Sequence, residues 1–221
     1  MALASGIGPQ HLGTLWVLDL AEPSLVGPMP RVAVIFQRVG PEAAPSLAQA
    51  MELEGPGEVL KRFAAGKRCY TGTVEGELAT YGWVTFDEES IGELRLRIRL
   101  APGEAYIWDC VTLAAYRGLL LYPALLCHMI TDLRSEGLKR IWIGADADNL
   151  PSQKGIVLCG FQPIIDIVLD RVLAIRMAWA RGCPGAPKQL VEEARRKLLG
   201  GRHEAWLAAL SSASSRTTTS R

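Results

Sequence analysis

The hydrophobic pattern divides the first third of the chain into short strands and helices. Residues 31–39 (RVAVIFQRV) are β-branched and apolar, and they predict a strand. A shorter strand is predicted at 15–20, after a loose lead-in over residues 1–12. Helices are expected over 41–53 and again over 57–66, because apolar residues recur there at steps of three and four.

An antiparallel meander is predicted next. Segments 68–74 and 78–86 flank Glu75-Gly76 and read as a hairpin. Apolar and polar positions alternate strictly over 91–100, which predicts a strand with one solvated face. The polar positions of that strand are Arg95, Arg97 and Arg99. A further strand is expected at 105–112.

From Arg117 the period changes from two to about four. Apolar residues at four-residue steps predict one helix that ends near Gly137, with a strand following at 138–145. These steps fall at Leu121, Leu125, His128 or Met129, and Leu133. The strand, helix and strand over 105–145 therefore form a βαβ crossover, which should be right-handed.

The remaining pattern predicts a capped helix, two strands and a C-terminal helical part. Asn149 is the expected N-cap of a helix that Gly160 ends. Apolar runs at 161–169 and 172–179 read as a strand pair, and Asp170-Arg171 divides them. Helices are expected over 188–199 and 203–210, before a Ser/Thr-rich tail at 211–221.

This order predicts an α+β (three-layer α/β) fold. Its centre is a mixed, mostly antiparallel sheet with one right-handed βαβ crossover, flanked by helices. The expected organisation is an N-terminal extension over 1–30 with a short strand, a main domain over 31–180, a helical extension over 181–210 and a disordered tail over 211–221. The last helices form either a dimerisation element or a cover for their own domain.

Composition and charge exclude several classes. With 24 basic and 23 acidic side chains, the net charge of +1 provides no global field for nucleic acid. The apolar run at 15–20 is too short to span a bilayer, so the sequence predicts a soluble cytoplasmic protein. The five cysteines and three histidines lack zinc-ligand spacing, and no metal is expected. Cys127 and His128 are adjacent on a predicted helix and face different sides, which argues against a Cys–His nucleophile.

An anion-binding site is indicated at the strand-to-helix junction after residue 112. A helix that begins near Gly118 directs unpaired N–H groups and its positive dipole end toward the preceding loop. Arg117 adds a formal charge, Gly118 removes side-chain bulk, and Pro123 suits a first helical turn. An ordinary junction with a solvated arginine fits these residues equally well.

The junction resembles the acyl-CoA-binding motif of GNAT superfamily N-acetyltransferases, Arg/Gln-x-x-Gly-x-Gly/Ala at a strand-to-helix turn, often written V-x-P-x-Y-R-G-x-G. Tyr116-Arg117-Gly118 match it directly, with Thr112 at the valine position and Ala114 at the proline position. Leu120 and Tyr122 stand where the motif has glycines. The chain departs from the family at both positions.

A second resemblance lies downstream. Asn149, Ser152 and Gly160-Phe161 follow the strand at 138–145 in the order of the family's Asn-x-x-Ala/Ser and Gly-Phe signature. The resemblance covers about 31–179 and implies acetyl-CoA as acyl donor, held in a slot between two splayed parallel strands. The implied cofactor-binding residues are Val111, Thr112, Leu113, Arg117, Gly118, Leu119, Leu120, Leu121, Tyr122, Asn149 and Ser152.

The resemblance also implies direct attack by an amine on the thioester, with a general base and acid. Strand alternation places Ile107, Asp109 and Val111 on one face, and Asp109 is the predicted base, with an exposed Glu104 as the second choice. Many relatives carry an acid tyrosine at the position of Ile156. Tyr116, Tyr122 or water is the predicted substitute, with Tyr116 taken as catalytic.

Two other functions stay open at this point. One is a GNAT-fold protein that binds CoA or a partner without catalysis, and the other is transfer of a different acyl group or transfer to a hydroxyl. The acceptor is an unidentified amine, and a homodimer is possible through the C-terminal helices. Acidic residues at 52–54 and 87–89 would favour a cationic amine, although such clusters are usually solvated.

Overall fold

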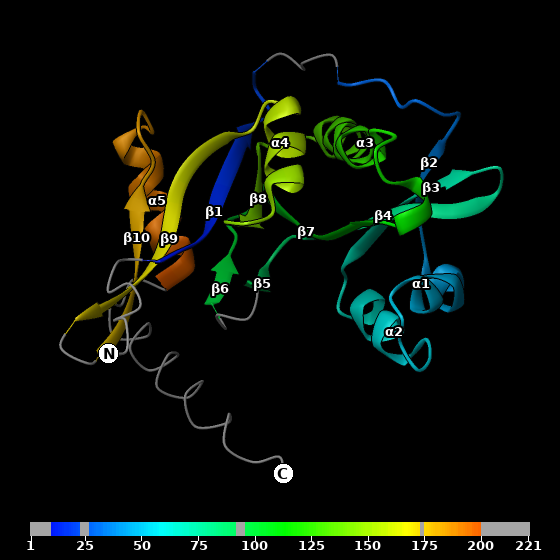
Figure 1. The fold of residues 1–221 in the computed structure, drawn as a ribbon, viewed down its shortest axis with the longest axis horizontal. Coiled ribbons are helices and arrows are strands. Elements are labelled where there is room, and N and C mark those ends of the chain that lie inside the picture. Colours follow the sequence, from blue (N-terminus) through cyan, green and yellow to red (C-terminus); the bar gives the residue numbers. More distant parts are fainter. Residues whose placement is uncertain (1–9, 23–26, 92–95, 173–174, 200–221) are drawn as a thin grey trace, which may run out of the picture.

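The computed structural model describes residues 10–22, 27–91, 96–172 and 175–199. A mixed sheet forms the centre of the fold (Figure 1). Its strands are β1 (Gln10–Asp19), β2 (Ile35–Val39), β3 (Arg68–Val74), β4 (Glu77–Thr85), β7 (Glu104–Thr112), β8 (Arg140–Asp146), β9 (Gln162–Val172) and β10 (Ile175–Gly182). The order across the sheet is β10-β9-β1-β8-β7-β4-β3-β2. All neighbours are antiparallel except β7 and β8, which are parallel. The predicted fold class is confirmed.

Helices cover both faces of this sheet. They are α1 (Ala44–Ala50), α2 (Gly57–Ala64), α3 (Leu121–Ser135), α4 (Leu150–Leu158) and α5 (Lys188–Leu199), with 3₁₀ turns at Pro41–Ala43 and Ala114–Tyr116. Helices α3 and α4 lie on one face, and α1, α2 and α5 lie on the other with the two-stranded ribbon β5 (Glu88–Ile91) and β6 (Leu96–Arg99). No helix in the described part of the chain is long and apolar enough to cross a membrane.

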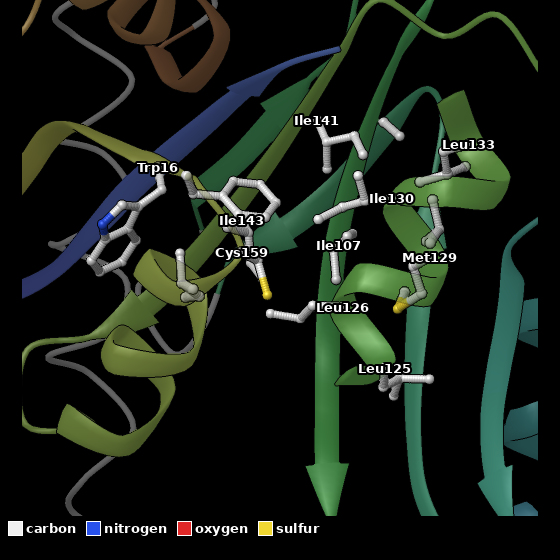
Figure 2. Close-up of a cluster of buried hydrophobic side chains, with 14 of the residues drawn as sticks. Trp16, Ile107, Leu125, Leu126, Met129, Ile130, Leu133, Ile141, Ile143 and Cys159 are labelled. Carbon is white, nitrogen blue, oxygen red and sulfur yellow. The ribbon is translucent and has the colours of Figure 1, made fainter. Parts of the chain in front are cut away.

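The core beneath α3 follows from two periodicities. On α3, Leu125, Met129 and Leu133 recur every four residues and are fully buried. On the sheet, alternate residues of the two parallel strands, such as Ile107 and Ile143, point to the same face and meet them (Figure 2). The predicted helical face is therefore the one that packs on the crossover strands.

Strand β1 lies inside the sheet, between β8 and β9, and is antiparallel to both. It begins at Gln10, so residues 10–12 belong to a strand and the expectation of a loose lead-in was wrong there. Strand order along the chain could not indicate this placement, because the partners of β1 follow it by more than 120 residues.

Several predicted boundaries shift. The strand expected at 31–39 begins only at Ile35, and the helix expected at 41–53 is a 3₁₀ turn followed by the short α1. Asp170-Arg171 lie within β9 and do not divide two strands. In each case the pattern located the element, and its ends depend on contacts with other parts of the chain.

Strand β5 was not predicted. It pairs with β6, where Glu88 bonds the exposed Arg97 and Arg99, so these two predicted wet-face arginines are confirmed. Arg95, the third member of that stripe, lies outside the described residues. The helix predicted over 203–210 and the tail predicted over 211–221 also lie outside them.

Helix α5 packs back onto its own sheet. Val191, Ala194 and Leu198 are buried against β6, β9 and β10. Lys197, only 9% exposed, forms an ion pair with Glu104 of β7. Glu104 was expected to be exposed, but it is 6% exposed and accepts further hydrogen bonds from neighbouring groups. These come from Ala101 N–H at 2.8 Å and Trp142 Nε1 at 3.2 Å.

Candidate active site: a cleft between diverging strands

The two parallel strands β7 and β8 pair only over their first halves. Pairing ends at Ile107 and Ile143, and beyond these residues the strands separate. A cleft of about 1010 Å³ occupies the gap. It is lined by Tyr122 and Ser152 from the helices of one face and by Arg62 of α2 from the other. The cleft therefore passes through the sheet, and two reactants could approach from opposite faces.

A β-bulge at Asp109 shapes the wall of this cleft. Tyr81 pairs with Val111 and Trp83 with Trp108, so two residues of β7 stand opposite the single Gly82. Asp109 has φ 44°, a left-handed conformation that costs a non-glycine residue about 1–2 kcal/mol. The bulge reverses the alternation after residue 109 and corrects the predicted faces. Val111 joins the core cluster beneath α1 and α2, away from Ile107 under α3.

Asp109 lines the cleft and bonds Arg62, which neighbours it only in space. Arg62 Nη1 donates to Asp109 Oδ2, and both side chains are largely buried. The guanidinium carbon lies 4.6 Å from the centroid of Trp108 and 5.2 Å from that of Trp83. The predicted base is therefore in the cleft, with a partner that sequence reasoning did not identify. The only indication of Arg62 in the sequence was general: a buried carboxylate needs a cation as its partner.

The loop between η2 (Ala114–Tyr116) and α3 presents a row of unused donors. The backbone N–H groups of residues 118–122 donate to no acceptor within the described ranges. Helix α3 begins at Leu121, three residues later than the predicted start near Gly118. Gly118 has φ 79° and Leu120 has φ 61°, so both adopt the left-handed conformation and curve the loop. This arrangement has the donor chemistry of a phosphate-binding nest.

Two arginines hold this loop. Arg117 Nε donates to the Thr112 carbonyl at 3.3 Å, and Arg31 Nη1 donates to the Gly118 carbonyl at 3.3 Å. The backbone N–H of Arg31 also donates to the Leu119 carbonyl at 3.0 Å. Both guanidinium groups are exposed beside the unused donors. Arg31 was read as the start of a strand, and nothing in its local sequence indicates contact with a loop almost 90 residues later.

The conformation of Leu120 gives a prediction about stability. The left-handed region costs Leu or Ala about 1–2 kcal/mol and costs Gly almost nothing. We expect Leu120→Gly to be more stable than Leu120→Ala by about 1 kcal/mol in urea unfolding, because both remove the side chain but only glycine removes the strain.

A matched pair of variants controls for the general effect of glycine. Lys154 is an exposed residue of α4 without a positive φ. There Lys154→Ala should be more stable than Lys154→Gly by about 1 kcal/mol, which is the ordinary helical order. Equal stabilities of the two variants at position 120, or the same order as at position 154, would contradict this account.

The start of α4 meets the first turn of α3 at the cleft. Asn149 caps α4, and its Oδ1 accepts the Ser152 N–H at 3.2 Å, which confirms the predicted N-cap. The Ser152 hydroxyl lies 2.9 Å from that of Tyr122. Burial raises the pKa of Tyr122 well above its usual range, because removal from water disfavours the phenolate. The close approach requires Gly155, since a Cβ there would lie 2.6 Å from the Tyr122 ring.

The end of β7 presents Thr112 to the gap. The Val111 carbonyl accepts the Thr80 hydroxyl at 2.8 Å, and the Leu113 N–H donates to the Ala79 carbonyl at 2.9 Å. Both flanking residues thus direct backbone groups toward β4. Backbone direction alternates along a strand, so Thr112 faces the side that β8 has left. Its carbonyl accepts Arg117 Nε, and the cofactor contacts predicted for Val111, Thr112 and Leu113 stay predictions.

Tyr122 is the tyrosine near the α3–α4 contact that lines the cleft, and the other positions predicted or expected to carry the acid tyrosine do not. Tyr116, the predicted catalytic tyrosine, lies on the 3₁₀ turn beyond the end of β7 and does not line the cleft, whereas Tyr122 does. Ile156, at the position where many relatives carry a tyrosine, is fully buried beneath α4. Cys127 also lies outside the cleft, with its Sγ 3.3 Å from that of Cys159. The described residues contain no cluster of three or more metal-ligating side chains.

Comparison with known proteins gives a family match. The model of the acetyltransferase (GNAT) family matches residues 44–161, just over half of the chain. No curated protein matches the chain. Among solved structures, an acetyltransferase from the GNAT family of Colwellia psychrerythraea aligns at 13% identity with a TM-score of 0.53. The alignment covers 73% of this chain and 56% of that one.

A GCN5-related N-acetyltransferase from Sphaerobacter thermophilus also aligns at 13% identity and a TM-score of 0.53. This alignment covers 72% of this chain and 50% of the Sphaerobacter thermophilus chain. The chain thus spans only about half the length of these two structures. At this identity the alignments establish a shared fold, and they leave open what the cleft binds.

Proposed function

Because this chain belongs to the acetyltransferase (GNAT) family, we propose that it transfers an acyl group, in the first instance acetyl, from acyl-CoA to an amine. The two reactants meet in a ternary complex, and the amine attacks the thioester directly. The observation that carries the proposal is the cleft through the sheet, which is lined on one side by Tyr122, the last residue of the donor-rich stretch 118–122, and on the other by the Asp109 carboxylate.

The residues present fit the pyrophosphate of CoA. Five consecutive unused N–H donors, at residues 118–122, curve beside Arg117 and Arg31 at the N-terminal end of a 15-residue helix. Dianionic groups are stabilised by such donors and by the helix dipole. Thr112, Asn149 and Ser152 would then contact the arm that extends from the pyrophosphate into the cleft. CoA supplies the activated acyl group when it is bound.

The chemistry needs three proton movements. The acceptor's ammonium loses one proton before it attacks, and the nitrogen loses a second after it bonds the carbonyl carbon. The C–S bond breaks and the sulfur leaves as a thiol with one proton, so one proton is released overall. Asp109, which lines the cleft beside Arg62, is the proposed acceptor of the first proton, directly or through water; Asp146 and Asp148 also line the cleft. Tyr122, whose hydroxyl is protonated at neutral pH and lines the cleft, is the proposed donor to the sulfur, and the second proton lost by the nitrogen returns to it. Tyr122 thus replaces Tyr116 in the proposed acid role.

A binding measurement tests the loop assignment. Acetyl-CoA at 100 times its Kd should raise the free energy of unfolding by about 2.7 kcal/mol, seen as a thermal shift. Arg117→Glu should abolish this shift, because it places a negative charge beside the phosphate donors. Lys188→Glu changes an exposed lysine on α5 by the same charge and should keep the shift. An undiminished shift in Arg117→Glu would remove this loop from the proposal.

The second candidate is a GNAT-fold protein that binds CoA without catalysis. Leu120 in a strained glycine position and the buried Ile156 favour it, because both depart from the family pattern near the cleft. Release of free thiol from acetyl-CoA in the presence of amines separates the candidates. Binding without thiol release across amines, hydroxyl acceptors and longer acyl-CoA donors would favour the binding protein.

A further inference from the structure

Arg62 presents most of its hydrogen-bonding capacity to the cleft. A guanidinium carries five N–H donors, and only Nη1 of Arg62 has an acceptor among the described residues, namely Asp109. The side chain is 17% exposed and lines the cleft on the face opposite α3. Burial of a charged group with unused donors is unfavourable unless a ligand or water completes it.

Two tryptophans hold this guanidinium in place. Its carbon lies close to the rings of both Trp83 and Trp108, whose centroids are 6.1 Å apart. These cation–π contacts use none of the N–H groups, so the donors that Asp109 does not take stay available for hydrogen bonds. A planar guanidinium edge with two parallel N–H groups matches a carboxylate, which it binds in bidentate fashion.

The charge next to Arg62 is balanced, because Asp109 is its ion-pair partner. Lys67, whose ammonium lies over the Trp108 ring, pairs with Glu89, and neither Lys67 nor Glu89 lines the cleft. The other carboxylates that line the cleft are Asp146 and Asp148, at and just beyond the end of β8. A ligand that presents a carboxylate to Arg62 and an ammonium to Asp109 matches the ion pair at this wall.

On these grounds, and resting on the transfer function proposed above, we propose that the acceptor is a free α-amino acid. Arg62 binds its carboxylate, and Asp109 binds its ammonium through the oxygen that Arg62 does not use. An α-amino acid carries its carboxylate and its ammonium on the same carbon. The two groups can therefore contact the neighbouring Arg62 and Asp109 at the same time. The ammonium is then held at the bulge, beside the gap in which the thioester lies.

The neighbouring lining indicates the side chain of this amino acid. Ile91 and Trp108 also line the cleft, are partly buried and offer apolar surface. An apolar or aromatic side chain would contact them. Phenylalanine and leucine are therefore the probes, and phenethylamine and 3-methylbutylamine are their matched analogues without the carboxylate.

The experiment measures kcat/KM for thiol release from acetyl-CoA with each probe and its decarboxylated analogue. The wild-type protein should prefer the amino acid by at least about 100-fold, since the analogue leaves buried charged donors without an acceptor. Arg62→Gln should reduce this preference to below about 10-fold. Arg62→Lys, which keeps the charge but loses the planar edge, should give an intermediate value. Retained stabilisation by acetyl-CoA shows that each variant is folded.

A second readout does not depend on turnover. With CoA bound, phenylalanine should raise the thermal midpoint of the wild-type protein, phenethylamine should not, and Arg62→Gln should lose the response. Equal turnover of the acid and the amine would overturn the α-amino acid and leave the transfer function intact. If acetyl-CoA binds but neither amino acids nor amines release thiol, the transfer function itself fails, and this inference fails with it.

Discussion

Replacing Lys197 by methionine is expected to lower the free energy of unfolding by about 3–5 kcal/mol, the largest effect on stability that we expect from a single side chain. The side chain of Lys197 is 8% exposed, and its ammonium pairs with the carboxylate of Glu104, whose side chain is 6% exposed. Methionine fills a similar volume but leaves the carboxylate buried without its main partner. Urea unfolding followed by circular dichroism measures the loss.

Two further variants show whether the loss comes from the unpaired carboxylate. In Glu104→Gln with Lys197→Met, no charge remains in this pair, and the amide oxygen can still accept from one of Ala101 N–H and Trp142 Nε1, which bond different oxygens of Glu104. This double variant should recover more than half of the loss. Lys188→Met on the exposed side of the same helix should stay within about 0.5 kcal/mol of the wild type. A loss below about 1 kcal/mol for Lys197→Met would show that the pair contributes little.

The same pair has a pH signature. Burial alone would raise the pKa of Glu104, but hydrogen bonds from Lys197 and the Ala101 N–H together hold it below its usual value of 4.5. A depressed folded pKa stabilises the protein above the unfolded pKa, and this contribution is lost as pH falls through the folded value. The gap between wild type and Lys197→Met should therefore be widest near neutral pH and narrow below about pH 4.

The elements whose signal is local were predicted from the sequence. The four-residue steps from Leu121 to Leu133 identified α3, and the side chain of Asn149 identified the start of α4. The junction between β7 and α3 was located because a strand pattern changes to a helix pattern there. Each of these signals lies within about fifteen residues, which is the range over which periodicity and capping operate.

The parts that depend on distant partners were missed. The bulge at Asp109 exists only opposite Gly82, so strict alternation gave the wrong faces beyond it. The insertion of β1 between β8 and β9 and the contact of Arg31 with Gly118 likewise join segments far apart in sequence. A single chain carries no local trace of such pairings, and they decide which side chains reach the cleft.

Leu120 stands at the position of a motif glycine and keeps a left-handed backbone there. The left-handed backbone at this position is the conformation that glycine adopts without strain, which explains why a glycine suits it. The chain retains the loop shape with leucine and keeps the N–H donors that a phosphate needs. The substitution therefore affects strain and space, while the chemistry of the donors is preserved. This is why CoA binding is proposed in spite of it.

Replacing Asp109 by asparagine is expected to lower kcat for thiol release by about 10²–10⁴-fold, the range that a general base contributes. Asparagine is nearly isosteric, and its oxygen can still accept from Arg62, so the bulge and the wall should persist. Acetyl-CoA should stabilise this variant as it does the wild type. Asp87→Asn, at an exposed carboxylate outside the cleft, should leave kcat within a few-fold.

The pH dependence of that loss distinguishes a base from a residue that only positions Arg62. The carboxylate is needed to remove a proton from the acceptor's ammonium, and this need disappears once the acceptor is already deprotonated in solution. The deficit of Asp109→Asn should therefore shrink as pH rises toward the pKa of the ammonium. A deficit of constant size across that range would mean that Asp109 orients Arg62 and the acceptor without accepting the proton. Bulk water or another group would then have to serve as the base.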